Sequence, residues 1–132
     1  HKGEIDMRVL VCGGRDFNDK ELLNNILDNI AKEFSKLYSP DDNWLPTDIT
    51  IISGVCKGAD TLASNWAIHN YTQLEEYPAQ WNVYGRSAGF RRNTQMLVEG
   101  KPDLVLAFPG GRGTDMMCQI ASDAGVEVRK VK

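Results

Sequence analysis

Three short apolar runs in this chain are each followed directly by a glycine-rich turn. The runs span residues 7–12, 49–52 and 103–108, and the turns behind them span residues 13–16, 53–58 and 109–114. A segment with the apolar spacing of a helix follows each turn. Continuous apolar runs are typical of strands that helices cover on both faces. The alternation of strand and helix therefore predicts an α/β fold with a mostly parallel sheet.

The remaining elements complete a five-stranded pattern. Helices are predicted over residues 19–37, 59–69, 90–98 and 115–124, further strands over 73–77 and 127–131, and loops over 38–48 and 78–89. In a strand order of 3-2-1-4-5, the first and fourth strands are central neighbours, and ligands bind at the carboxyl edge where the order reverses. We therefore expect a three-layer Rossmann-like domain in which the three glycine turns line one continuous crevice.

Length and composition predict one domain over residues 7–132. Residues 1–6 precede it as a tag remnant or a short extension. The net charge of −3 disfavours a general nucleic-acid coat or a membrane-surface protein. No apolar stretch is long enough to span a bilayer, and no signal peptide is visible. Three widely separated cysteines, Cys12, Cys56 and Cys118, have neither zinc-type nor disulfide spacing, which favours the cytoplasm and a small core role for Cys12.

The glycine turns predict an anion site built from backbone N–H groups. A turn that opens a helix presents unpaired N–H donors and the positive helix end, both of which favour phosphate. Pro109 ends the preceding strand, and Thr114 is a good N-cap for the helix that follows. The ligand-binding residues predicted from the turns are Gly13, Gly14, Ser53, Gly54, Gly58, Pro109, Gly110, Gly111, Gly113 and Thr114.

Cationic side chains in or near the turns can add charge to this site. Lys57 is either a point charge for a phosphate or a solvated loop lysine. Arg112 is predicted to contact the ligand, whereas the sequence leaves Arg15 open between ligand and solvent. Arg91 and Arg92 are adjacent and cannot both face the sheet, so one guanidinium is expected at the crevice and the other at solvent or a partner subunit.

The acidic and aromatic candidates each have two interpretations. Asp60 either starts a helix or accepts a hydrogen bond from a ribose hydroxyl, and Asp16 lies in the first turn within reach of the crevice. Trp81 and Tyr84 either stack on a nucleobase or cover the sheet edge. His69 closes a helix and is given no catalytic role. Neither His nor Cys clusters into a metal site, and no cofactor is required, although Mg²⁺ is compatible with a phosphate ligand.

Four ordered motifs resemble the YspA-like group of the SLOG superfamily, to which the DprA and "lonely guy" Rossmann-like proteins belong. They are RVLVCGGRDF (8–17), SGVCKGADTLASNWA (53–67), YGRSAGFRRNTQML (84–97) and PDLVLAFPGGRGTD (102–115). The resemblance implies a nucleotide-binding domain that often forms homodimers through its helices. It does not assign a reaction, because many members of the group have no known activity.

The lonely-guy phosphoribohydrolases are the nearest relatives with known chemistry, the cleavage of a nucleoside monophosphate to base and ribose 5-phosphate. Their Arg-Lys-x-x-Met signature corresponds to Arg92-Asn93-Thr94-Gln95-Met96, and the resemblance adds Asn93, in place of the lysine, to the predicted ligand-binding residues. Their Pro-Gly-Gly-x-Gly-Thr-x-x-Glu signature corresponds to residues 109–117, where Met117 replaces the catalytic glutamate. A thioether cannot stabilise the positive charge that develops on the ribose. Asp115 is either a replacement carboxylate or a residue that complements the helix dipole.

Two functions are consistent with these residues. In the first, the protein binds a nucleotide or nucleotide-derived phosphate as a sensor or sequestering module, a role that suits a small domain encoded by a phage or mobile element. In the second, it is a nucleotide hydrolase of the phosphoribohydrolase type, with Arg92 and Asp115 as catalytic residues and Asp16 or Asp60 as alternative acids. The missing glutamate favours binding. DNA handling of the DprA kind is disfavoured by the acidic charge and the short chain.

Overall fold

The computed structural model describes residues 6–38 and 46–132, and the predictions for residues 1–5 and 39–45 lie outside it. The strands are β1 (Met7–Cys12), β2 (Ile49–Ser53), β3 (Gln73–Glu76), β4 (Leu104–Ala107) and β5 (Glu127–Lys130). The helices are α1 (Lys20–Tyr38), α2 (Ala59–His69), α3 (Trp81–Tyr84), α4 (Ala88–Gly100) and α5 (Arg112–Asp123), and the short 3-10 turns are η2 (Pro46–Asp48) and η3 (Gly85–Ser87).

The five strands form one parallel sheet in the order β3-β2-β1-β4-β5. This confirms the predicted α/β class and strand order. Leu10 in β1 lies beside Ile52 of β2 and Val105 of β4, so the apolar runs form the centre of the sheet. With this register, the carboxyl ends of β1, β2 and β4, and the glycine turns behind them, lie along the same edge.

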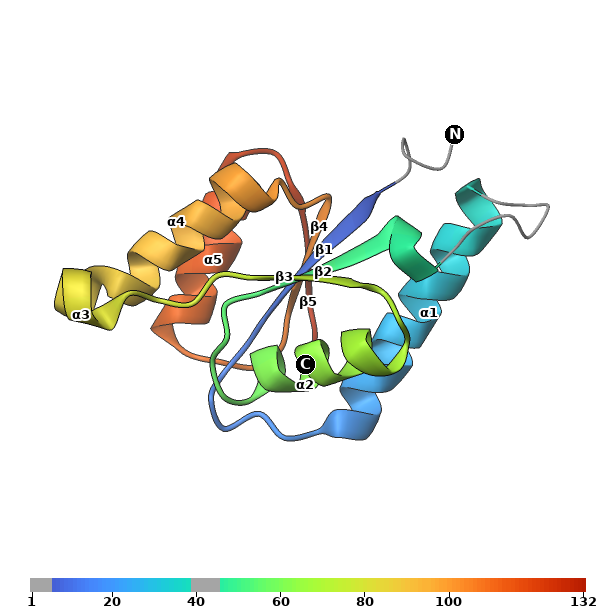
Figure 1. Ribbon diagram of the computed structural model, residues 1–132, viewed down its shortest axis with the longest axis horizontal. Helices are drawn as coiled ribbons and strands as arrows, with labels where there is room; N and C mark the ends of the chain where they lie inside the picture. The colour runs from blue at the N-terminus through green and yellow to red at the C-terminus, as the bar shows by residue number, and fades with distance from the viewer. Residues whose placement is uncertain (1–5, 39–45) are drawn as a thin grey trace.

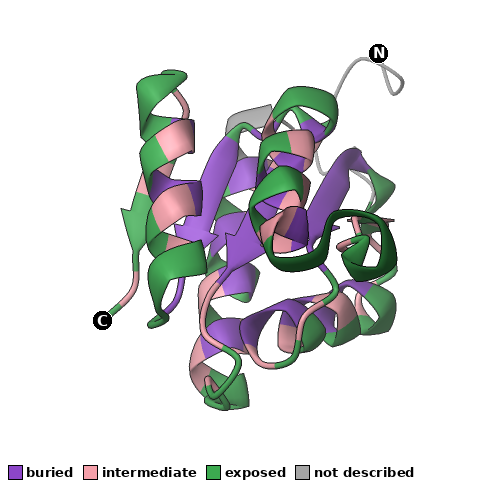
Figure 2. Cartoon of the chain, turned by 90° about the vertical axis from the view of Figure 1, so that its left-hand side faces the viewer, coloured by how far each residue is buried: buried purple, intermediate pink, exposed green. Residues whose placement is uncertain are grey.

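Helices cover both faces of the sheet, giving three layers (Figure 1). On one face, α1 and α2 pack on the strands through residues such as Leu23, Leu27 and Trp66. On the other, α4 and α5 bury Met96 and Met117 against the same strands. Figure 2 shows the central strands as a buried layer between helices whose outer sides are exposed. Within the described residues, no helix is long and apolar enough to cross a membrane.

Two local predictions were wrong. The predicted loop over residues 78–89 contains α3 and η3, because Val83 and Tyr84 donate their backbone N–H groups to the carbonyl of Gln80 and start a turn of helix. α5 begins at Arg112 rather than at residue 115, since the Asp115 N–H already donates to the Gly111 carbonyl at 3.0 Å. The N-cap is therefore Gly111, and Thr114 lies inside the first turn without a capping role.

Arg8 forms side-chain hydrogen bonds between separate segments near the amino end of the sheet. Its guanidinium donates to the Gly100 carbonyl at 2.6 Å, to Glu75 at 2.6 Å and to Asp6 at 2.8 Å, with the Arg8 side chain 17% exposed. We expect Arg8→Leu to lower the free energy of unfolding by about 1 to 3 kcal/mol, since it leaves a half-buried carbonyl and carboxylate without their donor.

Chemical denaturation of Arg8→Leu measures this loss, with Arg129→Leu as the matched control. Arg129 also contacts two carboxylates, those of Glu127 and Glu33, but its side chain is 43% exposed and exposed ion pairs contribute little. A loss for Arg129→Leu equal to that for Arg8→Leu would contradict the role given to Arg8.

Candidate functional site

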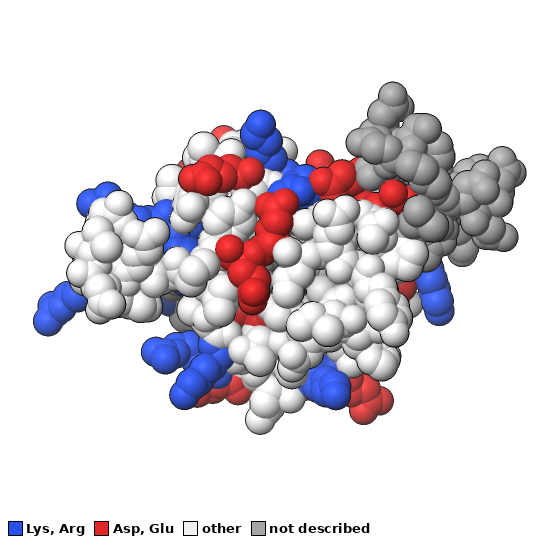
Figure 3. Space-filling view, viewed as in Figure 1, with Lys and Arg blue, Asp and Glu red and all other residues white. Residues whose placement is uncertain are grey.

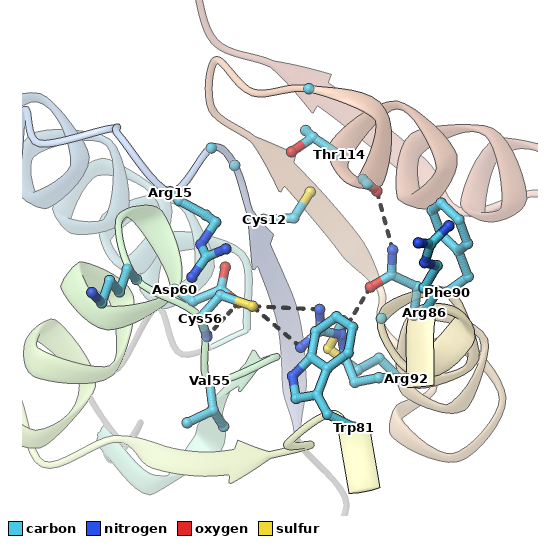
Figure 4. Close-up of a pocket in the computed structure, with 18 residues that line it drawn as sticks. Cys12, Arg15, Val55, Cys56, Asp60, Trp81, Arg86, Phe90, Arg92 and Thr114 are labelled. Atoms are coloured by element: carbon cyan, nitrogen blue, oxygen red, sulfur yellow. Dashed lines mark hydrogen bonds between the residues drawn. The ribbon is translucent and has the colours of Figure 1, made fainter. Parts of the chain in front are cut away.

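A cavity of about 830 Å³ opens at the carboxyl edge of the sheet, between the glycine turns and α4 (Figure 4). Its volume lies within the range of about 300 to 1,000 Å³ typical of small-molecule sites. Ten of the predicted ligand-binding residues line it: Gly13, Gly14, Arg15, Lys57, Asp60, Arg92, Asn93, Gly111, Gly113 and Thr114. All three turns contribute to this list, as the sequence predicted.

The first and third turns touch each other through their backbones. The Gly14 N–H donates to the Pro109 carbonyl at 2.8 Å, and a Cβ on Gly110 would lie 2.6 Å from the Gly14 nitrogen. Only glycine permits such an approach, because any side chain would displace backbone. Gly110 and Pro109 thus bring the turns together, whereas neither is among the residues that line the cavity.

Gly58 brings the second turn against the first. Its φ is +82°, and a Cβ there would lie 2.1 Å from the Gly14 carbonyl oxygen. Both the backbone angle and the contact exclude a side chain. The wall of the cavity therefore depends on glycines that do not themselves line it.

Arg92 of α4 lies at the cavity and braces the second turn. Its guanidinium donates to the Gly54 carbonyl and lies 3.5 Å from the Cys56 sulfur through both terminal nitrogens. A Cβ on Gly54 would lie 2.6 Å from Arg92 Nη1, so the glycine makes room for the guanidinium. Arg92 is the arginine that faces the crevice, but much of its hydrogen-bonding capacity is used within the protein.

Asn93 joins α4 to the start of α5. It is 5% exposed, accepts a hydrogen bond from Arg92 Nε at 3.0 Å and donates to the Gly113 carbonyl at 3.1 Å. The pair Arg92–Asn93 therefore connects the second and third turns across the cavity floor. A buried amide with both ends satisfied holds a fixed orientation.

Asp60 is the acidic side chain of the described cavity lining. It is 6% exposed, and burial raises its carboxyl pKa from 3.8 to about 6, although the Cys56 N–H at 3.2 Å and the Arg92 charge oppose the rise. A buried carboxylate of this kind binds a proton at mildly acidic pH, which a surface aspartate does not.

Several predicted residues lie outside the cavity. Arg91 lines a separate surface depression, and its guanidinium carbon lies 4.4 Å from the centre of the Tyr84 ring. Arg112 and Asp115 line another, shallow depression beside Phe90. Ser53 is buried, and its hydroxyl accepts the Val55 N–H at 3.2 Å. Asp16, Ser53, Gly54, Gly58, Pro109 and Gly110 do not line the cavity, and Met117 is buried in the core between α5 and the sheet.

Other lining residues were not predicted from the sequence. They are Cys12, Val55, Cys56, Arg86, Gly89, Phe90 and Met96. Trp81 also lines the cavity and is 58% exposed, whereas Tyr84, with which it was paired in the sequence, does not. The motif at residues 84–97 contains Arg86, Gly89 and Phe90, and a helix assigned across that motif would have indicated them. No group of three or more His, Cys, Asp or Glu side chains that could hold a metal occurs among residues 6–38 and 46–132.

Comparison with known proteins gives two matches. A family model described as "YspA, cpYpsA-related SLOG family" matches residues 7–84, which include β1, the first two glycine turns and α2. The chain is also 33% identical over 129 residues to the Gene 61 protein of Mycobacterium phage D29, covering 92% of this chain and 93% of that protein. No solved structure matches the chain significantly.

Proposed function

The chain belongs to the YspA, cpYpsA-related SLOG family, and from that premise we propose that it binds a nucleotide or nucleotide-derived phosphate at the cavity, as a sensor or sequestering module. Family membership supports a nucleotide-related function. The relative in Mycobacterium phage D29 agrees with the expectation that a phage encodes a domain of this kind.

The start of α5 is the observation that carries the proposal. Gly111, Gly113 and Thr114 line the cavity, and a Cβ added at either glycine would meet nothing within 4 Å. The first backbone N–H groups of a helix have no partner within it, and here they lie beside open space at the positive helix end. A phosphate placed there would satisfy donors that the helix itself cannot.

Hydrolysis is the second candidate, and Asp60 is the observation that favours it. A general acid at neutral pH needs a carboxyl whose pKa lies near that pH, and burial raises the Asp60 pKa to about 6 at the cavity wall. Asp115 is exposed and lies in a different depression, and Met117 is in the core. If the protein is a phosphoribohydrolase, we propose Asp60 rather than Asp115 as its acid, with Arg92 beside it.

A thermal-shift series with nucleotides tests binding, and chromatography of each mixture tests turnover. A bound nucleotide raises the free energy of unfolding by mass action, by about 2.7 kcal/mol at a hundredfold excess over Kd, and Tm rises with it. Intact recovery of the stabilising nucleotide supports a sensor or sequestering module, and recovery as base plus sugar phosphate supports the hydrolase. Absence of stabilisation by every nucleotide would contradict the proposed function.

Gly111→Val tests the place of binding. Position 111 has φ −108°, outside the left-handed region that favours glycine, and the side chain would enter the open space beside the helix start. We expect the Tm without ligand to stay close to that of the parent and Kd to rise at least about tenfold, or about 1.4 kcal/mol.

Ser122→Val is the matched control for this substitution, because it places the same side chain at an exposed position near the far end of α5. It should leave Kd unchanged. Equal Kd values for Gly111→Val and the parent would place the ligand elsewhere.

A further inference from the structure

The charge of the cavity lining is opposite to that of the whole chain. Four cationic side chains, Arg15, Lys57, Arg86 and Arg92, line it against one carboxyl, that of Asp60. The chain as a whole carries a net charge of −3. Figure 3 shows Lys and Arg side chains at several separate places around the edge of this face, some of them at the lower left, and acidic side chains in a band that runs down the middle. The cationic lining is therefore a local feature.

Three of the four cations are free to meet a ligand. Arg92 is held by Gly54, Cys56 and Asn93. Arg15, Lys57 and Arg86 are exposed, and no hydrogen bond or ion pair joins them to another residue of the described chain. Like charges around one cavity repel each other unless an anion lies between them.

The free cations come from different walls. Arg15 and Lys57 belong to the first and second turns. Arg86 belongs to η3. Figure 4 shows Arg15 extending from the side of β1 and Arg86 on the opposite side, beside Phe90 and α4. A single phosphate beside Arg15 and Lys57 would therefore leave Arg86, on the opposite side, without an anion.

We propose that the ligand carries at least two linked phosphate groups, as a nucleoside diphosphate does, either free or as part of a larger nucleotide. One phosphate lies at the start of α5 near Arg15 and Lys57, and the second is directed toward Arg86. The cavity of about 830 Å³ lies in the upper part of the usual range for small-molecule sites and has room for such a chain. This inference rests on the proposed function and adds the number of phosphates.

Calorimetric titration with matched nucleosides, 5′-monophosphates and 5′-diphosphates of all four bases tests it. With the parent protein, we expect the diphosphate of the preferred base to bind at least tenfold more tightly than its monophosphate. Added salt should narrow this difference, because exposed charges are screened.

Arg86→Ala should bring diphosphate affinity down to about the monophosphate value and leave monophosphate affinity unchanged. Arg112→Ala is the matched control, since Arg112 is an exposed arginine close by whose side chain lies outside the cavity. The affinities of Arg112→Ala for the diphosphate and the monophosphate should both equal those of the parent.

The outcomes separate this inference from the proposed function. Monophosphates that bind as tightly as diphosphates, or an Arg86→Ala variant that weakens both equally, would overturn the two-phosphate ligand and leave nucleotide binding standing. No binding by any of these compounds would overturn both. Tighter diphosphate binding that depends on Arg86 but not on Arg112 would support the inference.

Discussion

Gly58→Ala is expected to lower the free energy of unfolding by about 3 to 5 kcal/mol. Position 58 has φ +82° and ψ −129°, a region that side chains rarely adopt, and the new Cβ would lie 2.1 Å from the Gly14 carbonyl oxygen. Relief requires the first and second turns to separate, because the obstructing atom belongs to the backbone. The cavity wall would open as the fold weakens.

Gly125→Ala is the matched control for backbone strain. Gly125 has φ +81°, almost the same as Gly58, but a Cβ there would meet nothing within 4 Å. Gly125→Ala should lower the free energy of unfolding by only about 1 kcal/mol, which is the strain of the left-handed backbone. Chemical denaturation of both variants separates the two costs. Equal losses would show that the contact between Gly58 and Gly14 contributes nothing beyond strain.

Asp60→Asn is expected to stabilise the protein at pH 7.5 by roughly 3 kcal/mol, since a pKa shift of one unit corresponds to 1.36 kcal/mol. The folded protein holds Asp60 at a pKa of about 6, compared with 3.8 for an ordinary aspartate. The ionised form is therefore disfavoured in the fold, and an amide removes that cost while its oxygen can still accept the Cys56 N–H. Such a destabilising residue is expected at a functional site rather than in a packed core.

The pH dependence has a definite sign. Between about pH 4 and 6 the folded state holds a proton on Asp60 that the unfolded state has released, so stability falls as pH rises through this window. Above pH 6 the full cost is present, and below pH 4 it is absent. The difference between Asp60→Asn and the parent should therefore be large at pH 7.5 and small at pH 4.

Thermal unfolding across this pH range makes the measurement, with Asp115→Asn as the control. Asp115 is exposed in the first turn of α5, and its loss should cost at most about 1 kcal/mol from the helix dipole. If Asp60→Asn gains nothing at pH 7.5, the carboxyl has another partner in the fold. If the protein hydrolyses nucleotides, Asp60→Asn should stop turnover and Asp115→Asn should not.

The fold and the glycine-turn cavity could be predicted because they depend on local patterns. Continuous apolar runs and helical spacing record which faces are buried, and parallel order then places all strand-to-helix turns at one edge. Gly111 and Gly113 could be predicted at the cavity because they lie at that edge of the sheet and at the start of a helix. The family resemblance, carried by the same segments, was confirmed by the match over residues 7–84.

The sequence alone determined the α/β fold and the turns that meet at the cavity, since each follows from residues close together in the chain. The strand order was predicted as the usual order of such a fold, and the pairing of the strands confirms it. Only the tertiary structure decided which charged side chains face that cavity. Arg92 rather than Arg112 lies there, and Arg86 joins it from a segment predicted to be a loop. Asp60 owes its raised pKa to burial in the folded chain. These properties depend on helix rotation and on contacts between distant segments, and no local pattern records either.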